Sequence, residues 1–149
     1  METIFIVAFI FSCILVLYLY KNKSNYLITA LPLFVLASHQ LEEYVLSPLM
    51  FGDKYHFLEW AFRSGVNISP IEVTTINSVP YFLLPLLFLL KPSTKIFSIL
   101  FLFNSSLLLS NGMFHIGLAT AQTDYSPGMV TSLFMYIPLY IKSLYLASE

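Results

Sequence analysis

The sequence predicts an all-α protein, a bundle of helices that cross a membrane. Hydrophobic residues make up 58% of the 149 residues and charged residues only 10%, against roughly a quarter in an ordinary soluble domain. The mean hydropathy is +0.79, and the apolar residues gather in runs of about 20, the length that a helix needs to cross the hydrocarbon core. A chain of this length is expected to form one domain, so residues 1–149 should fold as a single transmembrane unit.

The apolar runs predict five spans, at about 3–20, 26–46, 71–90, 96–119 and 127–146. The first run follows Glu2 and lacks the basic start and the small-residue cleavage site of a signal peptide, so we expect it to be retained. Pro32 lies inside the second run and is expected to kink it, and Pro48 is expected to end it. Pro127 is expected to open the fifth run, because proline is favoured in the first turn of a helix.

The one long connection, between residues 51 and 70, predicts a short interfacial helix at about 52–64. An apolar stripe recurs there at helical spacing and is formed by Phe51, Tyr55, Leu58 and Phe62. Polar residues share the opposite side, a pattern typical of a helix that lies in the membrane interface. Two interpretations stay open, an ordinary amphipathic connector and a lid over a site.

Basic residues are distributed unevenly between the two sides of the predicted bundle. One side carries Lys21, Lys23, Lys91, Lys95 and Lys142, and the other carries Lys54 and Arg63. Because lysine and arginine gather on the cytoplasmic side, we expect the N-terminus outside and the C-terminus in the cytoplasm. The net charge of −1 does not favour nucleic acid as a partner, and the lipid bilayer is the partner that the composition implies.

The second run carries ionisable residues where its neighbours belong in hydrocarbon. These residues are His39, Glu42 and Glu43, and residues three and four apart share one face of a helix. Burying such groups in a membrane costs free energy, so they should face the interior of the protein and form a functional site.

Polar residues of the other runs are expected at the same depth as this motif. Asn111 and His115 lie near the outer end of the fourth run. The outer ends of the third and fifth runs add Glu72, Asn77, Tyr125 and Thr131. Because the runs alternate in direction, all of these groups should converge on the external side of the membrane.

Three blocks of the chain resemble the HXXEE family of small bacterial integral membrane proteins. They are His39-x-x-Glu42-Glu43, Asn111-x-x-x-His115 and Tyr125-x-Pro127-Gly128-x-x-Thr131, in this order. The resemblance covers the second to the fifth run and implies the cytoplasmic membrane of a bacterium. Because the family is defined by its motif, the resemblance indicates residues to examine and implies no reaction.

The residues favour a membrane-embedded, metal-dependent enzyme that acts on a lipid-like or amphipathic substrate. His39 and His115, with one or both of Glu42 and Glu43, supply two imidazoles and a carboxylate, a set that suits zinc or non-haem iron with an open position. The remaining glutamate, Glu42 or Glu43, would act as the general base, and Asn111 would assist it. Supporting roles fall to Asn77, Glu72, Tyr125 and Thr131.

Three alternatives stay open. One is a metal-free enzyme in which a glutamate and a histidine move protons on a lipid-like substrate, as in a double-bond isomerisation. Another is a non-enzymatic carrier or binding protein that uses the cluster as an ion or ligand site. The last is a purely structural cluster of hydrogen bonds that holds the helices together.

Overall fold

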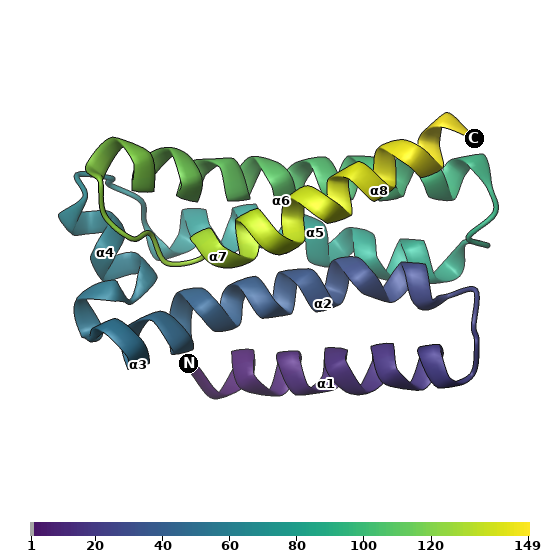
Figure 1. The fold of residues 1–149 in the computed structure, drawn as a ribbon, viewed down its shortest axis with the longest axis horizontal. Coiled ribbons are helices and arrows are strands. Elements are labelled where there is room, and N and C mark those ends of the chain that lie inside the picture. Colours follow the sequence, from purple (N-terminus) through teal and green to yellow (C-terminus); the bar gives the residue numbers. More distant parts are fainter. Residues whose placement is uncertain (1) are drawn as a thin grey trace.

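The computed structural model describes residues 2–149, and every regular element among them is a helix (Figure 1). The long helices are α1 (Glu2–Lys21), α2 (Leu27–Leu41), α5 (Pro70–Leu89), α6 (Lys95–Gln122) and α8 (Ile137–Ser148). Two of them belong to longer runs that contain a π-helical segment. The first run comprises α2, η1 (Glu42–Leu46) and α3 (Ser47–Phe51), and the second comprises α7 (Met129–Thr131), η3 (Ser132–Tyr136) and α8. The prediction of an all-α protein is confirmed.

Four helical segments are long and apolar enough to cross a membrane, which fits insertion of the chain into one. They are α1, α5, α6 and the continuous run Met129–Ser148. The outward faces of these segments carry large exposed apolar side chains, such as Ile14 on α1 and Phe82 on α5, which favour contact with lipid over water. The run from α2 to α3 is not among the four, and the polar residues His39, Glu42 and Glu43 lie within it.

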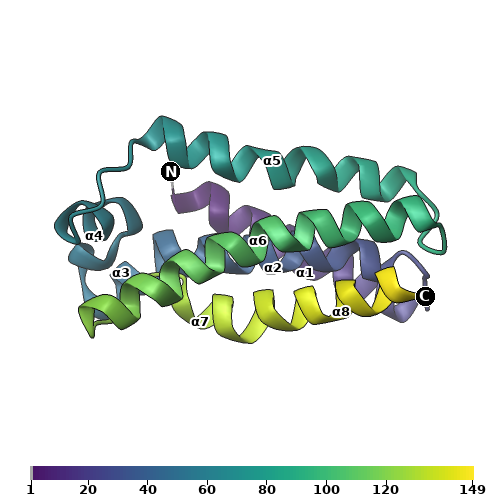
Figure 2. The same cartoon turned by 90° about the horizontal axis from the view of Figure 1, so that it is seen from above.

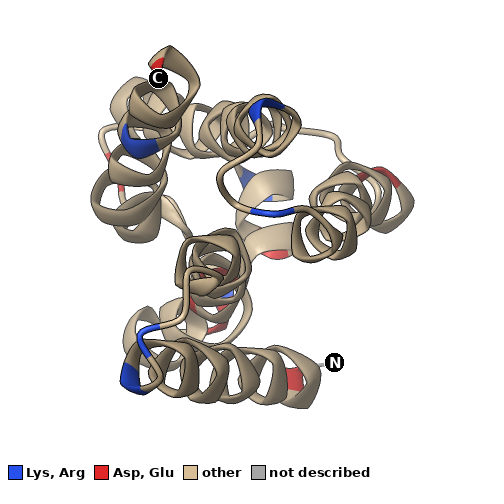
Figure 3. Ribbon diagram, turned by 90° about the vertical axis from the view of Figure 1, so that its right-hand side faces the viewer, with Lys and Arg blue, Asp and Glu red and all other residues tan. Residues whose placement is uncertain are grey.

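The helices lie side by side around a core that α2, α5, α6, η3 and α8 form together. This core consists of Val35, Leu36, Leu87, Phe97, Phe101, Leu108, Tyr136 and Leu139. Helix α1 packs against α2 on the outside of the bundle (Figures 1 and 3). Seen from above, α5 diverges from α6 toward the end that carries α4 (Figure 2). The N-terminal half of α5 therefore lies farther from α6 than its C-terminal half does.

Each π-helical segment ends two residues before a proline, Pro48 in the first run and Pro138 in the second. A proline inside an α-helix lacks the amide donor and crowds the carbonyl four residues earlier. A π turn is wider and bonds five residues back, as the Ser47 amide does to the Glu42 carbonyl oxygen. This wider turn accommodates the proline, so Pro48 does not end the run as the sequence predicted, and the helix continues to Phe51.

The connector differs from the single helix predicted at 52–64. It forms a 3-10 turn, η2 (Asp53–Tyr55), and a short helix, α4 (Phe57–Arg63), because the backbone is extended at His56. Helix α4 buries Phe57, Trp60 and Ala61, which lie on a different face from the predicted stripe. Phe62, a member of that stripe, is 74% exposed. Helix α4 lies across one end of the bundle (Figure 1).

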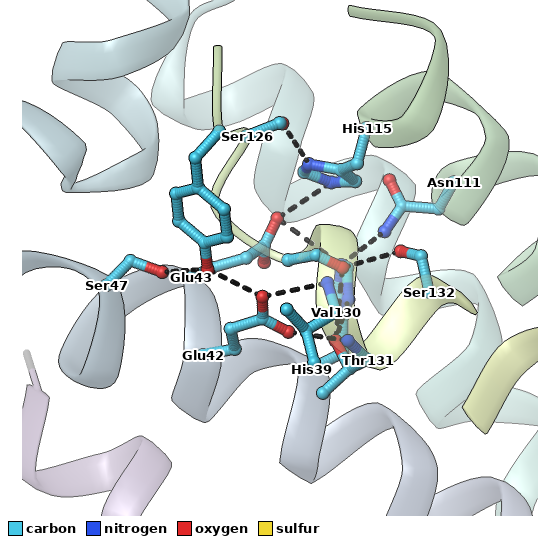
Figure 4. Close-up of polar contacts among 12 residues, drawn as sticks. His39, Glu42, Glu43, Ser47, Asn111, His115, Ser126, Val130, Thr131 and Ser132 are labelled. Atoms are coloured by element: carbon cyan, nitrogen blue, oxygen red, sulfur yellow. Dashed lines mark hydrogen bonds and ion pairs between the residues drawn. The ribbon is translucent and has the colours of Figure 1, made fainter. Parts of the chain in front are cut away.

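The last run begins at Met129, two residues after the predicted start at Pro127. Pro127 and Gly128 belong to the turn that precedes it, and Gly128 has a φ of +88°. Glycine adopts this left-handed conformation without steric cost. The turn brings residues 125–131 against α2, where the HXXEE motif lies (Figure 4).

Candidate functional site

Three ionisable side chains from α2, η1 and α6 converge inside the bundle (Figure 4). The Glu43 Oε1 atom lies 3.4 Å from His39 Nε2 and 3.0 Å from His115 Nε2. One possible ligand atom from each residue lies within 4.8 Å of the other two. All three residues are buried, with His39 and His115 at 0% exposure. The cluster therefore has the size and the donor types of a metal site.

Hydroxyl groups hold both imidazole rings by the nitrogen that faces away from Glu43. His39 Nδ1 lies 2.9 Å from Thr131 Oγ1, and this hydroxyl donates its own proton to the Gly128 carbonyl oxygen. His39 Nδ1 is therefore the donor, and its Nε2 carries a lone pair. Asn111 Nδ2, 3.1 Å from His39 Nε2, is a donor that fits this tautomer. His115 Nδ1 lies 3.3 Å from Ser126 Oγ, and either atom of this pair can be the donor.

The cluster brings the Glu43 carboxylate against one nitrogen of each histidine. His115 Nε2 is 3.0 Å from Glu43 Oε1, yet among the described residues it has no hydrogen-bond partner, and neither does Glu43 Oε2. Buried polar atoms are nearly always satisfied, because an unpaired one costs about 1–3 kcal/mol. A proton on His115 Nε2, or a metal ion held by both residues, would satisfy this pair.

Glu42, adjacent in sequence, points to a different place and caps the last helical run. Its carboxylate accepts hydrogen bonds from the Val130 amide at 3.0 Å, the Thr131 amide at 2.7 Å and the Tyr125 hydroxyl at 2.6 Å. The first amides of a helix have no partner within it, and a negative charge at that end is favourable. Gly128, the residue before this run, has no side chain that could cap it. Glu42, the first residue of η1, provides the cap instead.

Tyr125 lies in the turn between α6 and α7 and links Glu42 to α3. Burial, followed by the hydrogen bond to Glu42, raises the pKa of the Tyr125 hydroxyl above its ordinary value. The hydroxyl therefore stays protonated and remains a donor to Glu42, while Ser47 Oγ lies 2.8 Å from its oxygen. These contacts tie residues 125–131 to the HXXEE motif.

Gly128 lies directly against the His39 ring. A Cβ atom at this position would lie 2.5 Å from His39 Cε1 and 3.1 Å from Glu43 Cγ. No real Cβ atom tolerates such a separation from a ring atom, so any side chain would displace the imidazole. The carbonyl of Gly128 also accepts the hydroxyl protons of Thr131 and Ser132.

Aromatic rings and a small cavity complete the surroundings of the cluster. The Tyr136 ring centroid lies 4.7 Å from that of His39, and the Phe57 centroid lies 5.2 Å from that of His115. A cavity of 130 Å³ is lined by Glu43 and Asn111 together with residues of α4, α5 and the segment before α5. The cluster therefore has an adjacent space large enough for water or for a small part of a substrate.

A family model described as "Protein of unknown function with HXXEE motif" matches residues 30–142. The chain belongs to the HXXEE family. The matched segment runs from α2 to α8 and contains every residue of the cluster and of the Glu42 cap. No curated protein and no solved structure matches the chain. The family resemblance predicted from the three motif blocks is confirmed.

The structure brings together most, but not all, of the predicted site residues. His39, Glu43, Asn111, His115 and Thr131 are in contact within the cluster, and Tyr125 joins them through Glu42. Asn77 lines the 130 Å³ cavity. Glu72 lies apart, because its carboxylate accepts the Ser69 amide in a capping box at the exposed start of α5.

The sequence did not point to Ser126 or Ser47, nor to the contact between Gly128 and His39. Ser126 stands inside the Tyr125–Gly128 block, which the sequence analysis used only as part of a family motif. A hydroxyl next to a motif residue carries no signal of its own. Its role follows only from the 3.3 Å contact with His115 Nδ1.

Proposed function

We propose that this protein is a membrane-embedded, metal-dependent enzyme that acts on a lipid-like substrate. The metal ligands are His39, Glu43 and His115. One observation carries the proposal: atoms that can bind a metal, one from each of three buried side chains, lie within 4.8 Å of one another, and Glu43 Oε2 has no hydrogen-bond partner among the described residues. A divalent cation would satisfy them together and would replace the Asn111 amide as the partner of His39 Nε2.

The residues fit such an ion in kind and in number. Two imidazoles and one carboxylate form the set found at catalytic zinc sites with an open position and at non-haem iron sites. Histidine ligands usually donate their other N–H to a hydrogen-bond acceptor, which fixes the tautomer. Thr131 provides such an acceptor for His39, and Ser126 Oγ lies in position to accept from His115 Nδ1 when the metal is bound. When bound, such a metal activates a water molecule or polarises a substrate oxygen.

The chain's own groups have separate tasks around the metal. Glu43 lines the small cavity, and its Oε2 has no partner among the described residues, so this oxygen would be free to accept a proton from a water that the metal activates. Glu42 was also a candidate base, but its three hydrogen bonds favour a positioning role. Asn111 lines the cavity and can donate to a substrate oxygen.

The metal content of purified protein tests this proposal. Wild-type protein should hold one divalent metal per chain, and His115→Ala should lower the metal affinity by more than about 100-fold. Loss of a ligand costs more than the 10–100-fold that loss of a ligand's hydrogen-bond partner costs. His56 is the remaining histidine of the chain and is outside the cluster, so His56→Ala is the matched control and should retain the metal. The measurement is elemental analysis after dialysis against a graded chelator series.

A stoichiometric metal that persists in His115→Ala would contradict this ligand set. A wild-type protein that turns over a lipid substrate without any metal would favour the acid–base enzyme instead. The 3.0 Å contact between His115 Nε2 and Glu43 Oε1 supports that second candidate, because a proton could satisfy both atoms.

We also propose that the run from α2 to α3 is a fifth span and that the site lies on the outer side. The run lies alongside the four apolar segments (Figure 1), which supports a fifth crossing. The α1–α2 turn, which follows Lys21 and contains Lys23, and the α5–α6 turn, which contains Lys91, lie at the end of the bundle away from α4 (Figure 1). The positive-inside rule then puts this end in the cytoplasm, and α4 becomes an interfacial lid whose Phe57 packs against His115.

Cysteine labelling in intact cells tests this topology. Starting from a Cys13→Ala protein, Asn22→Cys and Ser93→Cys should resist a membrane-impermeant maleimide. Asp53→Cys, at the α4 end of the bundle, should react with the maleimide under the same conditions. Its labelling shows that the protein is present in the membrane and that the reagent reaches an external cysteine. Labelling of positions 22 and 93 from outside would reverse the orientation and put the site on the cytoplasmic side.

A further inference from the structure

Two larger cavities lie on either side of the N-terminal half of α5. The first has a volume of 530 Å³ and lies between α1, α2, α4 and α5, with Phe5, Ala8, Leu58 and Val73 in its mainly apolar lining. The second has a volume of 380 Å³ and lies between α5 and α6. Both volumes fall in the range of about 300–1,000 Å³ that is typical of ligand pockets. Figure 2 shows the divergence of α5 from α6 at this end.

Asn77 connects these cavities to the metal cluster. It lines the 530 Å³ cavity, the 380 Å³ cavity and the 130 Å³ cavity that reaches Glu43. Val73, one turn earlier on α5, is shared by the first and the third. Asn77 is half-buried and lies where the three cavities meet. A mainly apolar space thus leads past one amide side chain to the carboxylate of the cluster.

The polar groups in the wall of the 530 Å³ cavity are largely engaged with one another. The Tyr81 hydroxyl donates to Gln40 Oε1 at 2.5 Å, so this pair presents little hydrogen-bonding capacity to an occupant. The Thr74 and Ser78 hydroxyls donate to backbone carbonyls of their own helix. Since α1 and α5 are segments that fit a membrane, the walls of the cavity belong at hydrocarbon depth. A hydrocarbon chain is the occupant that this lining favours.

We infer that the 530 Å³ cavity holds the hydrocarbon chain of a lipid substrate whose polar group lies between Asn77 and Asn111, beside Glu43. This inference rests on the proposed function, because it places the substrate of that same site. No lysine or arginine is among the residues that line the three cavities. An anionic group would therefore lack a basic partner from the chain, and the Glu43 carboxylate is already engaged by the two histidines, so the polar group is an uncharged hydroxyl, ester or amide.

Photo-crosslinking in liposomes tests this assignment. The probe is a monoacylglycerol with a diazirine at the end of its acyl chain, added to phosphatidylcholine vesicles that contain the full-length protein. Adducts mapped by mass spectrometry should lie on the residues of α1 and α5 that line the 530 Å³ cavity. Ala8→Trp fills the cavity from α1 and should reduce labelling on the order of ten-fold. Val7→Trp is the matched control, because Val7 is the next residue, is 59% exposed and is not in the lining.

A second variant guards against an Ala8→Trp protein that fails to fold. Thr74 lines the same cavity from α5 and is exposed, so Thr74→Trp should fold and should also reduce labelling. Unchanged labelling in Thr74→Trp, or wild-type adducts confined to other surfaces, would overturn the assignment. A fatty-acid probe of equal length that labels as strongly as the monoacylglycerol would overturn the uncharged polar group.

Metal analysis of the same preparations separates this inference from the proposed function. Metal retained in wild-type protein with no adducts in the cavity would overturn the lipid assignment and leave the metal site intact. Adducts in the cavity without a metal would support the lipid assignment and contradict the metal-dependent function.

Discussion

Gly128→Ala is expected to remove metal binding while the helices still form. The new Cβ would lie 2.5 Å from His39 Cε1 and 3.1 Å from Glu43 Cγ, so the His39 ring or the turn must move. Misplacing a group by about 1 Å lowers the rate of a well-ordered active site on the order of 100-fold. We expect metal affinity and turnover to fall by at least this factor. Titration with a chromophoric chelator and helical circular dichroism together measure the effect.

Gly65→Ala is the matched control for this substitution. Gly65 has a φ of +76°, close to the +88° of Gly128, but an added Cβ would have no atom within 4 Å. Both substitutions carry the strain of a left-handed alanine, about 1–2 kcal/mol. Only Gly128→Ala adds the clash with His39. Equal losses of metal binding in the two variants would show that backbone strain, and not the contact with His39, is responsible.

The convergence of His39, Glu43, Asn111 and His115 could be predicted because the hydrophobic environment leaves few alternatives. Polar groups in membrane segments are costly wherever they face lipid, so spans that carry them turn these faces inward. The motif at His39 to Glu43 and the pair Asn111 and His115, far apart in sequence, then have to meet at one depth. The length of the spans and the alternation of their direction are enough to predict this.

The distinct positions of Glu42 and Glu43 could not be predicted in the same way. Adjacent residues of a helix point about 100° apart, and the sequence does not show which one faces the histidines. The π-helical turn η1 changes this angle further, and its cause, Pro48, was interpreted as the end of the helix. In the structure the two carboxylates have different partners. Glu43 contacts the imidazole rings, and Glu42 accepts hydrogen bonds from the amides of Val130 and Thr131.

The connector shows where periodicity alone fails. Its apolar residues Phe51, Tyr55, Leu58 and Phe62 predicted one helix, yet the chain breaks at His56 and buries Phe57 and Trp60. The contacts that decide this arrangement are tertiary: Phe57 packs against His115, and Tyr44 packs against both His56 and Phe57. Short helices depend on such contacts more than on their own pattern.

Glu42→Ala is expected to destabilise the protein more than any substitution of an exposed carboxylate. It would leave the Val130 and Thr131 amides and the Tyr125 hydroxyl without their acceptor in a site where Glu42 is only 6% exposed. An unsatisfied buried donor costs about 1–3 kcal/mol, so three of them imply a loss of about 3 kcal/mol or more. Thermal unfolding in detergent, followed by circular dichroism, measures this loss as a lowered Tm.

Glu72→Ala is the natural comparison. Glu72 also accepts a hydrogen bond from a backbone amide at the start of a helix, but its side chain is exposed and its partner, Ser69, is only three residues away. Its loss should cost about 1 kcal/mol, the usual effect of removing a helix cap. If Glu42 serves to hold Thr131 in place, Glu42→Ala should also weaken metal retention. Thr131 contacts His39 Nδ1, and its backbone amide would lose the hydrogen bond to Glu42. A Glu42→Ala protein with normal Tm and normal metal content but no turnover would instead place Glu42 in the chemistry, as the base that the sequence first allowed.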